Sequence, residues 1–302
     1  MSTTGQTLFL FLCLWIGANL LHAVWVHARR LLWERRTRRG ADGLLPAAAA
    51  FSVGDGPVAL LFVHGFADTP RIWARMADRL AASGTFRCRA MRLPGSALPW
   101  SQAKHQSLAL WRQAVDEEVD RLCNGSGSVW LVGHSLGGAL AIDAALRRPD
   151  RVAGVAALAP LIGVSRKRSP LLPPAVWFRL ASIALALSPT FESCFSADGV
   201  AVDDPTFTYS RDRFIPFCVY RGLFELVRAN GDAAARLSHP LFVATADGDS
   251  VVDTPAALRW LDACPQPKRV RTLTGVGHVL PLETGWQTLA DDLADFVRLQ
   301  AR

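Results

Sequence analysis

The sequence predicts an α/β protein built on a mostly parallel, doubly wound sheet, and three observations support this prediction. Short, continuous apolar runs such as Pro57–Val63 are typical of strands buried on both faces of a parallel sheet. These runs alternate with longer segments of helical periodicity, such as Thr69–Ala82, which is the pattern of βαβ units. The chain has 302 residues, 50% of them hydrophobic, so it can bury a sizeable core.

Each element of this fold has a local reason in the sequence. The segment Gly40–Val53, with its proline, indicates a linker followed by a lead-in strand. The predicted strands are short and apolar: Pro57–Val63, Phe86–Leu93, Val129–Val132, Val152–Leu158, Leu241–Ala246 and Val270–Leu273. The predicted helices show amphipathic spacing or strong helix formers: Thr69–Ala82, Ala109–Leu122, Leu136–Leu146 and Trp286–Leu299.

One insert, Leu161–Ser238, interrupts the alternation. At about eighty residues it is too long for a loop in a compact domain, so we expect it to have structure of its own and to act as a cap or lid. Within it, Pro174–Leu187 is apolar almost all round, with Arg179 as its only charge, and is too short to span a membrane. This segment fits a lid-core helix and a substrate- or membrane-facing helix equally well.

The N-terminal segment predicts a membrane anchor. Thr7–Val26 has no charged residue over twenty positions, the length that a helix needs to cross a bilayer. Ala28–Gly40 then holds six arginines and one glutamate, which by the positive-inside rule places the rest of the chain in the cytoplasm. A cleaved signal peptide is the alternative, but no basic residue precedes the apolar run. We therefore divide the chain into an anchor with a basic segment, 1–40, and a second domain, 41–302.

Charge and cysteine content exclude several classes of function. The net charge is +7, but Ala28–Gly40 contributes +5 of it, so the rest of the chain is close to neutral and nucleic-acid binding is not expected. The six cysteines are scattered without a C-x-x-C pair, which argues against a disulfide framework and a zinc site. No other cluster has metal-ligand spacing, and we expect neither a metal nor a cofactor.

Ser135 is the strongest candidate for chemistry. It stands at the centre of Gly133–Gly137, a G-x-S-x-G sequence between an apolar strand and an Ala/Leu-rich helix. A sharp strand–turn–helix needs neighbours without a Cβ so that the strand and the helix can approach each other. Such a turn can expose a serine as a nucleophile, although short Gly/Ser patterns also arise by chance.

Partners for a serine nucleophile follow the carboxyl ends of other predicted strands. His278 lies in a glycine-flanked loop after Val270–Leu273, and three aspartates, Asp247, Asp249 and Asp253, follow Leu241–Ala246. Because ligands of a doubly wound sheet bind at the carboxyl ends of its strands, these side chains are expected to meet. The chain order serine, acid, histidine is that of α/β-hydrolases.

Four segments, "LLFVHGFADTP", "GHSLGG", "LFVATADGDSVV" and "GVGHVLPLE", resemble the signature segments of the α/β-hydrolase superfamily. The chain is most similar to the bacterial carboxylesterase and monoacylglycerol lipase group, whose members carry a helical cap where Leu161–Ser238 falls here. The resemblance implies that Ser135 is the nucleophile, His278 the general base and acid, and Asp249 the residue that orients the imidazole. It also implies an oxyanion hole formed by the backbone N–H groups of Phe66 and Leu136.

The sequence departs from the family pattern at two places. Ala246 occupies a place where many members have glycine, and Asp249 is selected over Asp247 through the spacing to the apolar residue that follows. Ser96 and Ala97 replace the last two residues of the common P-G-H-G sequence, so substrate preference is where this chain is expected to differ.

The remaining histidines near these motifs, His64 and His134, are expected to make structural hydrogen bonds. Together the motifs predict a membrane-anchored serine hydrolase that cleaves carboxylic esters. The expected substrates are small-molecule or lipid esters with apolar acyl chains. Acyl transfer to an alcohol, or cleavage of an amide, thioester or C–C bond, would use the same residues. A catalytically inactive, membrane-tethered binding protein is the alternative of a different class.

Overall fold

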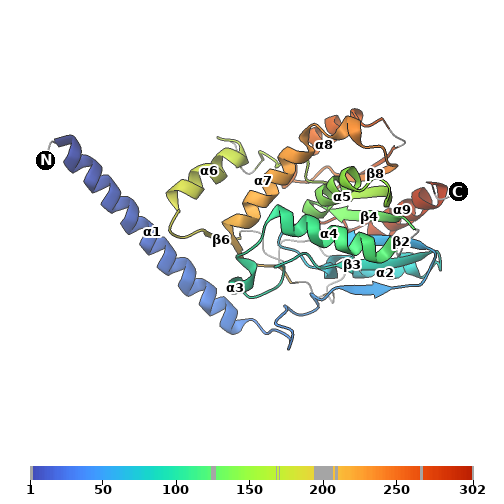
Figure 1. Cartoon of the computed structure of the whole chain (residues 1–302), viewed down its shortest axis with the longest axis horizontal. Helices are drawn as coiled ribbons and strands as arrows, with labels where there is room; N and C mark the ends of the chain where they lie inside the picture. The colour runs from blue at the N-terminus through green and yellow to red at the C-terminus, as the bar shows by residue number, and fades with distance from the viewer. Residues whose placement is uncertain are drawn as a thin grey trace.

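The computed structural model describes residues 3–123, 127–167, 169, 171–193, 207, 210–265 and 268–300. At its centre are the strands β1 (Phe51–Val53), β2 (Val58–Val63), β3 (Phe86–Met91), β4 (Val129–His134), β5 (Val152–Leu158), β8 (Leu241–Ala246) and β9 (Lys268–Leu273). They form one sheet in the order β1-β3-β2-β4-β5-β8-β9. Figure 1 shows this sheet with helices packed around it. Only the edge strand β1 is antiparallel to its neighbour, so the predicted α/β class with a mostly parallel sheet is confirmed.

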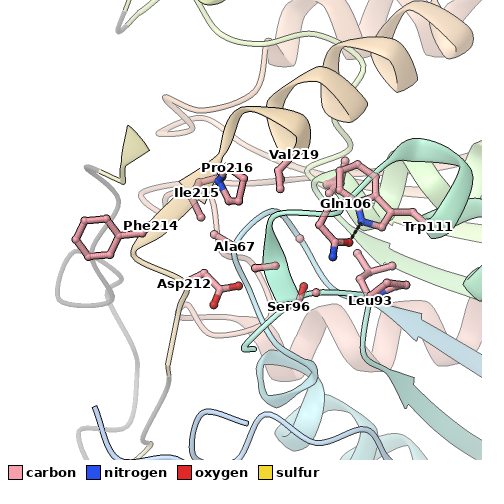
Figure 2. Close-up of a pocket in the computed structure, with 15 residues that line it drawn as sticks. Ala67, Leu93, Ser96, Gln106, Trp111, Asp212, Phe214, Ile215, Pro216 and Val219 are labelled. Atoms are coloured by element: carbon pink, nitrogen blue, oxygen red, sulfur yellow. Dashed lines mark hydrogen bonds between the residues drawn. The ribbon is translucent and has the colours of Figure 1, made fainter. Parts of the chain in front are cut away.

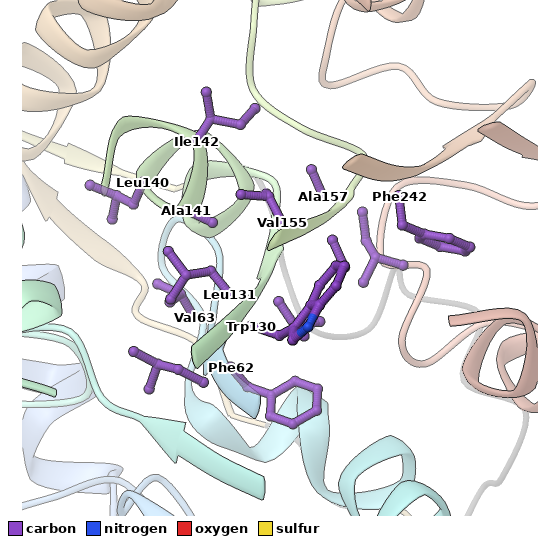
Figure 3. Close-up of a cluster of buried hydrophobic side chains, with 14 of the residues drawn as sticks. Phe62, Val63, Trp130, Leu131, Leu140, Ala141, Ile142, Val155, Ala157 and Phe242 are labelled. Carbon is purple, nitrogen blue, oxygen red and sulfur yellow. The ribbon is translucent and has the colours of Figure 1, made fainter. Parts of the chain in front are cut away.

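The helices cover the sheet in two groups. They are α2 (Ala74–Ala81), α3 (Trp100–Ala103), α4 (Leu108–Cys123), α5 (Leu136–Arg147), α7 (Phe217–Gly231), α8 (Thr254–Asp262) and α9 (Trp286–Gln300). Helix α5 packs between α4 and α7, while α2 and α9 pack together. The core lies between these helices and the central strands, where Phe62, Leu131 and Phe242 are fully buried (Figure 3).

The predicted helix over Thr69–Ala82 begins differently in the structure. Its first turn, Pro70–Trp73, is the 3₁₀ helix η1, and α2 follows from Ala74. Proline has no N–H and a fixed φ, so it suits a first turn that leads into the α-helix.

The insert between β5 and β8, here called the cap, has structure of its own, as expected. It contains α6 (Pro174–Ala184), an antiparallel pair of short strands, β6 (Thr190–Glu192) and β7 (Phe214–Pro216), and helix α7. Helix α7 contacts α4, α5 and α6 and so joins the cap to the sheet layer. Part of the cap, including Cys194, lies outside the described residues.

The N-terminal helix α1 (Thr3–Arg36) is longer than the predicted span, because it continues without a break through the arginine-rich segment. It is long and apolar enough to cross a membrane, a property that a signal sequence near an N-terminus shares. In Figure 1 it runs past the cap and projects away from the sheet. Two of its residues seven positions apart, Asn19 and Val26, are buried, so one stripe of α1 faces the rest of the protein.

Candidate active site

Ser135 stands on a strained turn between β4 and α5. Its φ is +54° and its ψ is −115°, in a region where a residue with a side chain is uncommon. The flanking glycines make the turn feasible: a Cβ on Gly133 would lie 2.2 Å from the Gly137 oxygen, and one on Gly137 would lie 2.0 Å from the Val63 oxygen. The Ser135 N–H donates to the Leu158 oxygen at 2.9 Å. The fold thus fixes this serine at the carboxyl end of β4, a central strand of the sheet.

His278 and Asp249 meet at the same edge of the sheet. The Nδ1 atom of His278 lies 2.7 Å from Oδ2 of Asp249, and the other carboxylate oxygen accepts the N–H groups of Val251 and Val252 at 2.7 and 3.1 Å. Burial by itself raises the pKa of the Asp249 carboxyl, but the hydrogen bonds from His278 and the two amides outweigh it and lower the pKa below its usual value. Asp249 therefore offers the imidazole an ionised partner.

The other two aspartates of this loop have different partners. Asp247 is exposed, and its side chain accepts the N–H of Gly275 at 2.9 Å. The Asp253 side chain caps helix α8 by accepting the N–H of Ala256 at 2.9 Å. Of the three aspartates that follow β8, Asp249 is the one hydrogen-bonded to His278.

His134, the residue before the serine, is fully buried and holds the loop of His278. Its Nε2 lies 2.9 Å from the His278 backbone oxygen, and the two rings are 4.9 Å apart between centroids. Burial, together with the nearby His278, lowers the pKa of His134 to about 4. The imidazole is therefore neutral at pH 7, with its hydrogen on Nε2, because the partner is a carbonyl oxygen.

His64 also has a structural role. It is fully buried, with Nδ1 2.9 Å from the Gly65 oxygen and Nε2 accepting the N–H of Leu93 at 3.1 Å. Burial lowers the pKa of His64 to about 4, so the ring stays neutral and serves as both donor and acceptor. The expectation of structural hydrogen bonding is confirmed for His64 and His134.

Glu283 was not singled out from the sequence, yet it braces the histidine loop. Its buried carboxylate accepts the N–H groups of Gly277 and Val279, the second at 2.9 Å, on either side of His278. The only signal in the sequence is an acidic residue directly after the apolar stretch Val279–Leu282. Buried carboxylates need such hydrogen bonds, so the residue has a role even without touching the imidazole.

Phe66 lies on a loop that adjoins the serine, and Leu136 follows the serine directly. Leu136 opens helix α5, where backbone N–H groups have no acceptor within the helix. A Cβ on Gly65, next to Phe66, would lie 3.3 Å from the serine Cβ, so the two loops are in close contact. The cap supports this loop from outside: Arg211 donates to the Phe66 oxygen at 3.1 Å and pairs with buried Asp68 at 2.8 Å. Both backbone amides thus belong to well-braced segments.

A cavity of about 540 Å³ opens onto Ser135 between the cap and the loops after the strands. Helix α6 contributes Trp177 and Phe178, and α7 contributes Tyr220 and Phe224. The remaining lining residues are Phe66, Leu161, Val164, Ser165, Ser169, Pro174, Ala181, Phe191, Leu223, Ser250 and Val251. None of these described lining residues is charged, and most are apolar, so the cavity suits an uncharged, largely apolar ligand.

A second cavity, of about 30 Å³, is lined by Gly65 and Ala67, on either side of Phe66, and is large enough for a water molecule (Figure 2). Its polar residues include Ser96, Gln106 and Asp212, and Gln106 is fixed by a hydrogen bond from Trp111 at 3.0 Å. Burial raises the pKa of Asp212 to about 7. The Asp212 side chain accepts the Ala97 N–H at 3.0 Å, so the loop that departs from the family pattern is held by the cap.

Comparison with known sequences finds a matching family profile and several relatives. The profile of the alpha/beta hydrolase family matches residues 60–292. Lipase LipV of Mycobacterium tuberculosis is 34% identical over 119 residues, which cover 37% of this chain and 41% of the lipase. A thermostable monoacylglycerol lipase of a Bacillus species is 30% identical over 107 residues, covering 35% of this chain and 42% of that enzyme. The matches thus span about two fifths of these relatives.

Comparison with solved structures covers more of the chain. A structure of the metagenome-derived lipolytic enzymes LipS and LipT superposes with a TM-score of 0.71 over 84% of this chain and 99% of that one, at 19% identity. A likeness at this identity supports the fold rather than a particular substrate.

Proposed function

The chain belongs to the alpha/beta hydrolase family, in its esterase and lipase group, and on this basis we propose that it is a serine hydrolase of carboxylic esters. One observation carries the proposal: Ser135 stands on the strained turn between β4 and α5, here called the elbow, and lines an apolar cavity. The hydrogen-bonded pair His278–Asp249 belongs to the loops at the same edge of the sheet. A serine nucleophile needs a base, and the base needs an acid that orients it.

In the proposed reaction, the Ser135 oxygen attacks the ester carbonyl while Nε2 of His278 takes the hydroxyl proton. Asp249 holds Nδ1 and stabilises the imidazolium that forms. The negative charge on the former carbonyl oxygen is accepted by the backbone N–H groups of Phe66 and Leu136, each such donor being worth ~3 kcal/mol.

The tetrahedral intermediate then collapses to an acyl-enzyme. The C–O bond to the alcohol breaks, and the alcohol leaves with the proton from His278. A water molecule next gives its proton to His278 and attacks the acyl carbon. The second intermediate releases the carboxylic acid, and the proton returns to the Ser135 oxygen.

The proposed substrates are esters with apolar acyl chains. The cavity is lined by aromatic and aliphatic side chains, and its described lining residues contribute hydroxyl groups but no charge. Burial of acyl CH₂ groups, at about 0.8 kcal/mol each, would supply the binding energy. A monoacylglycerol or another neutral lipid ester fits these properties.

Rates on p-nitrophenyl esters and monoacylglycerols of graded chain length test this function, with Ser135→Ala as the inactive reference. We expect hydrolysis that improves with chain length until the cavity is filled. Acyl transfer would be detected in the same assay by adding an alcohol acceptor. Absence of any serine-dependent hydrolysis across the panel would refute the proposal.

We further propose that α1 spans the membrane once and that the hydrolase domain lies in the cytoplasm. The charge-free run precedes six arginines, and drawing such a cluster across a bilayer is disfavoured. Attraction of the arginines to anionic lipid adds ~1 kcal/mol for each one near the surface. Fusions after residue 302 to a reporter active only in the cytoplasm, and to one active only outside it, test the orientation. Activity of the outside reporter would refute it.

A further inference from the structure

The cap helix α6 leaves its apolar surface largely uncovered. None of its residues is buried, although the segment has a single charge. The large apolar side chains on and beside it are exposed to the following extents: Leu171 80%, Val176 40%, Trp177 45%, Leu180 45%, Ile183 64% and Leu187 51%. A clustered apolar surface of this kind on a folded protein marks contact with another apolar phase or partner.

The polar residue Asn19 of α1 fastens the end of this helix. Its Nδ2 donates to the Ala184 oxygen at 2.7 Å, and its Oδ1 accepts the N–H of Leu187 at 3.2 Å. Ala184 is the last residue of α6, so Asn19 satisfies a carbonyl that the helix itself leaves without a donor. Asn19 is only 1% exposed, whereas most of the charge-free stretch of α1 around it is exposed.

This contact fixes the position of α6 along α1. Asn19 lies ten positions before Arg29, which is roughly 15 Å along a helix axis. At the level of Arg29, the guanidinium pairs with Glu192 of β6 at 2.6 and 2.8 Å. The cap thus meets α1 twice, once at the arginine-rich end and once deep within the apolar run. In Figure 1 the end of α6 that leads to β6 approaches α1.

The polar groups of α6 are compatible with an apolar surrounding. The Ser182 hydroxyl donates to the Phe178 oxygen within the helix at 2.7 Å. Arg179 is exposed, and its long aliphatic stem can carry the guanidinium toward the headgroups. At that depth, Asn19 also satisfies the Ala184 carbonyl and the Leu187 N–H.

We propose that α6 lies in the acyl-chain layer of the bilayer beside α1, held at that depth by Asn19, so that the active-site cavity opens to membrane lipid. Trp177 supports the last point, because this single side chain both lines the cavity and is 45% exposed. The inference rests on the proposed membrane span of α1, and it identifies the source of substrate as the bilayer rather than the aqueous phase.

Depth-dependent fluorescence quenching of the full-length protein tests this position. The label is placed at Ile183→Cys, in a background whose own cysteines are replaced by alanine. Val24→Cys in α1 and Leu258→Cys in α8 serve as controls for the span and for the hydrolase domain. The vesicles contain phosphatidylcholine and phosphatidylglycerol, with a nitroxide either near the headgroup or deep in the acyl chain. Activity on a water-soluble ester verifies that each labelled protein is folded.

We expect the deep nitroxide to quench the labels at Ile183 and Val24 but not the label at Leu258. Quenching at Val24 without quenching at Ile183 would overturn the inference while leaving the membrane span intact. Quenching at neither position would refute the span as well. Neither result changes the proposed ester chemistry, which the soluble-ester assay reports separately.

Asn19→Leu tests the role of the asparagine, with Leu20→Ala as the matched control on the exposed side of α1. We expect Asn19→Leu to reduce deep quenching at Ile183 and to slow hydrolysis of vesicle-borne monoacylglycerol about threefold to tenfold, the range found for a hydrogen bond between helices in a membrane. Hydrolysis of a soluble ester should be unchanged. If Asn19→Leu behaves like Leu20→Ala in both membrane assays, Asn19 does not set the position of the cap.

Discussion

His134 and His278, 144 positions apart in the sequence, are joined by a hydrogen bond of 2.9 Å from the His134 ring to the His278 backbone oxygen. His134 immediately precedes Ser135, so the residue next to the proposed nucleophile also holds the loop of the proposed base. With Glu283 bracing the same loop from the other side, the imidazole is placed by several independent contacts. Such support is what holds a catalytic geometry within narrow limits.

Replacement of the three aspartates by asparagine should separate their roles. Asp249→Asn removes the carboxylate from the His278 ring and favours the wrong tautomer, a change that costs about 10⁴-fold in kcat in the chymotrypsin triad. Asp247→Asn and Asp253→Asn should keep a kcat close to that of the parent protein. The Asp247 side chain is exposed, and the Asp253 side chain caps a helix, a position that asparagine fills as well. Steady-state kinetics on a soluble ester give the comparison. A crippled Asp247→Asn would contradict the assignment.

Glu283→Gln should lower kcat about tenfold with little change in KM. Glutamine can offer only one acceptor oxygen to the two N–H groups around His278, and an unsatisfied buried N–H costs ~1–3 kcal/mol. The rate of reaction with a fluorophosphonate should fall in the same proportion. Glu225→Gln, on the exposed surface of α7, is the control. An effect on thermal stability alone, with normal kcat, would show that Glu283 does not position the histidine.

Gly137→Ala should destabilise the protein by about 3 kcal/mol or more, as overpacking against backbone does. The new Cβ would meet the Val63 oxygen at 2.0 Å, and neither backbone segment can move without distorting the elbow. Gly231→Ala is the matched control, since nothing lies within 4 Å of its Cβ, and it should be neutral or slightly stabilising. Urea unfolding of both variants in detergent measures the difference. Equal free energies of unfolding for Gly137→Ala and Gly231→Ala would mean that the elbow has room for a Cβ at Gly137.

The stability of the fold should decline in acid over a defined window. His64 and His134 have a pKa of about 4 in the folded protein and a usual value of 6.5, so between these values the unfolded chain binds protons that the folded chain does not. Each histidine therefore contributes stability that is lost as pH falls from 6.5 to 4, by ~1.4 kcal/mol per pH unit. Asp212 acts in the opposite sense, because its pKa is raised from 3.8 to about 7.

With two histidines against one aspartate, the net change across this window remains a loss of stability on acidification. His64→Asn keeps a donor for the Gly65 oxygen but removes one titrating group, so it should cancel about one proton from the pH dependence. Free energies of unfolding measured across the window provide the test. A variant whose pH dependence equals that of the parent would show that His64 titrates normally in the folded state.

Local signals in the sequence were sufficient to predict the sheet and the elbow at Ser135. Apolar runs such as Val129–Val132 specify buried strands, and Gly133 and Gly137 mark a close approach that only glycine allows. The alternation of these runs with helices then brings Ser135, Asp249 and His278 to one edge of the sheet. The family match at residues 60–292 confirms the resemblance on which their proposed roles depend.

Contacts between distant segments could not be predicted in the same way. Nothing in the local sequence of Asn19 points to Ala184, and Arg211 has no pattern that indicates Asp68 or Phe66. Glu283 likewise acts through two backbone N–H groups that have no sequence signature. The partners of single polar side chains depend on how the cap packs on the sheet layer. That packing leaves no periodic pattern in the sequence from which the partners could be predicted.

Covalent labelling with a fluorophosphonate probe decides whether Ser135 is the nucleophile. A competent serine hydrolase forms a stable adduct on its nucleophile, and mass spectrometry locates it. We predict one adduct, on the peptide that contains Ser135, and neither labelling nor ester hydrolysis by a folded Ser135→Ala protein, since loss of a nucleophile costs several orders of magnitude in kcat. An adduct on another residue, or hydrolysis retained by Ser135→Ala, would refute the proposed mechanism.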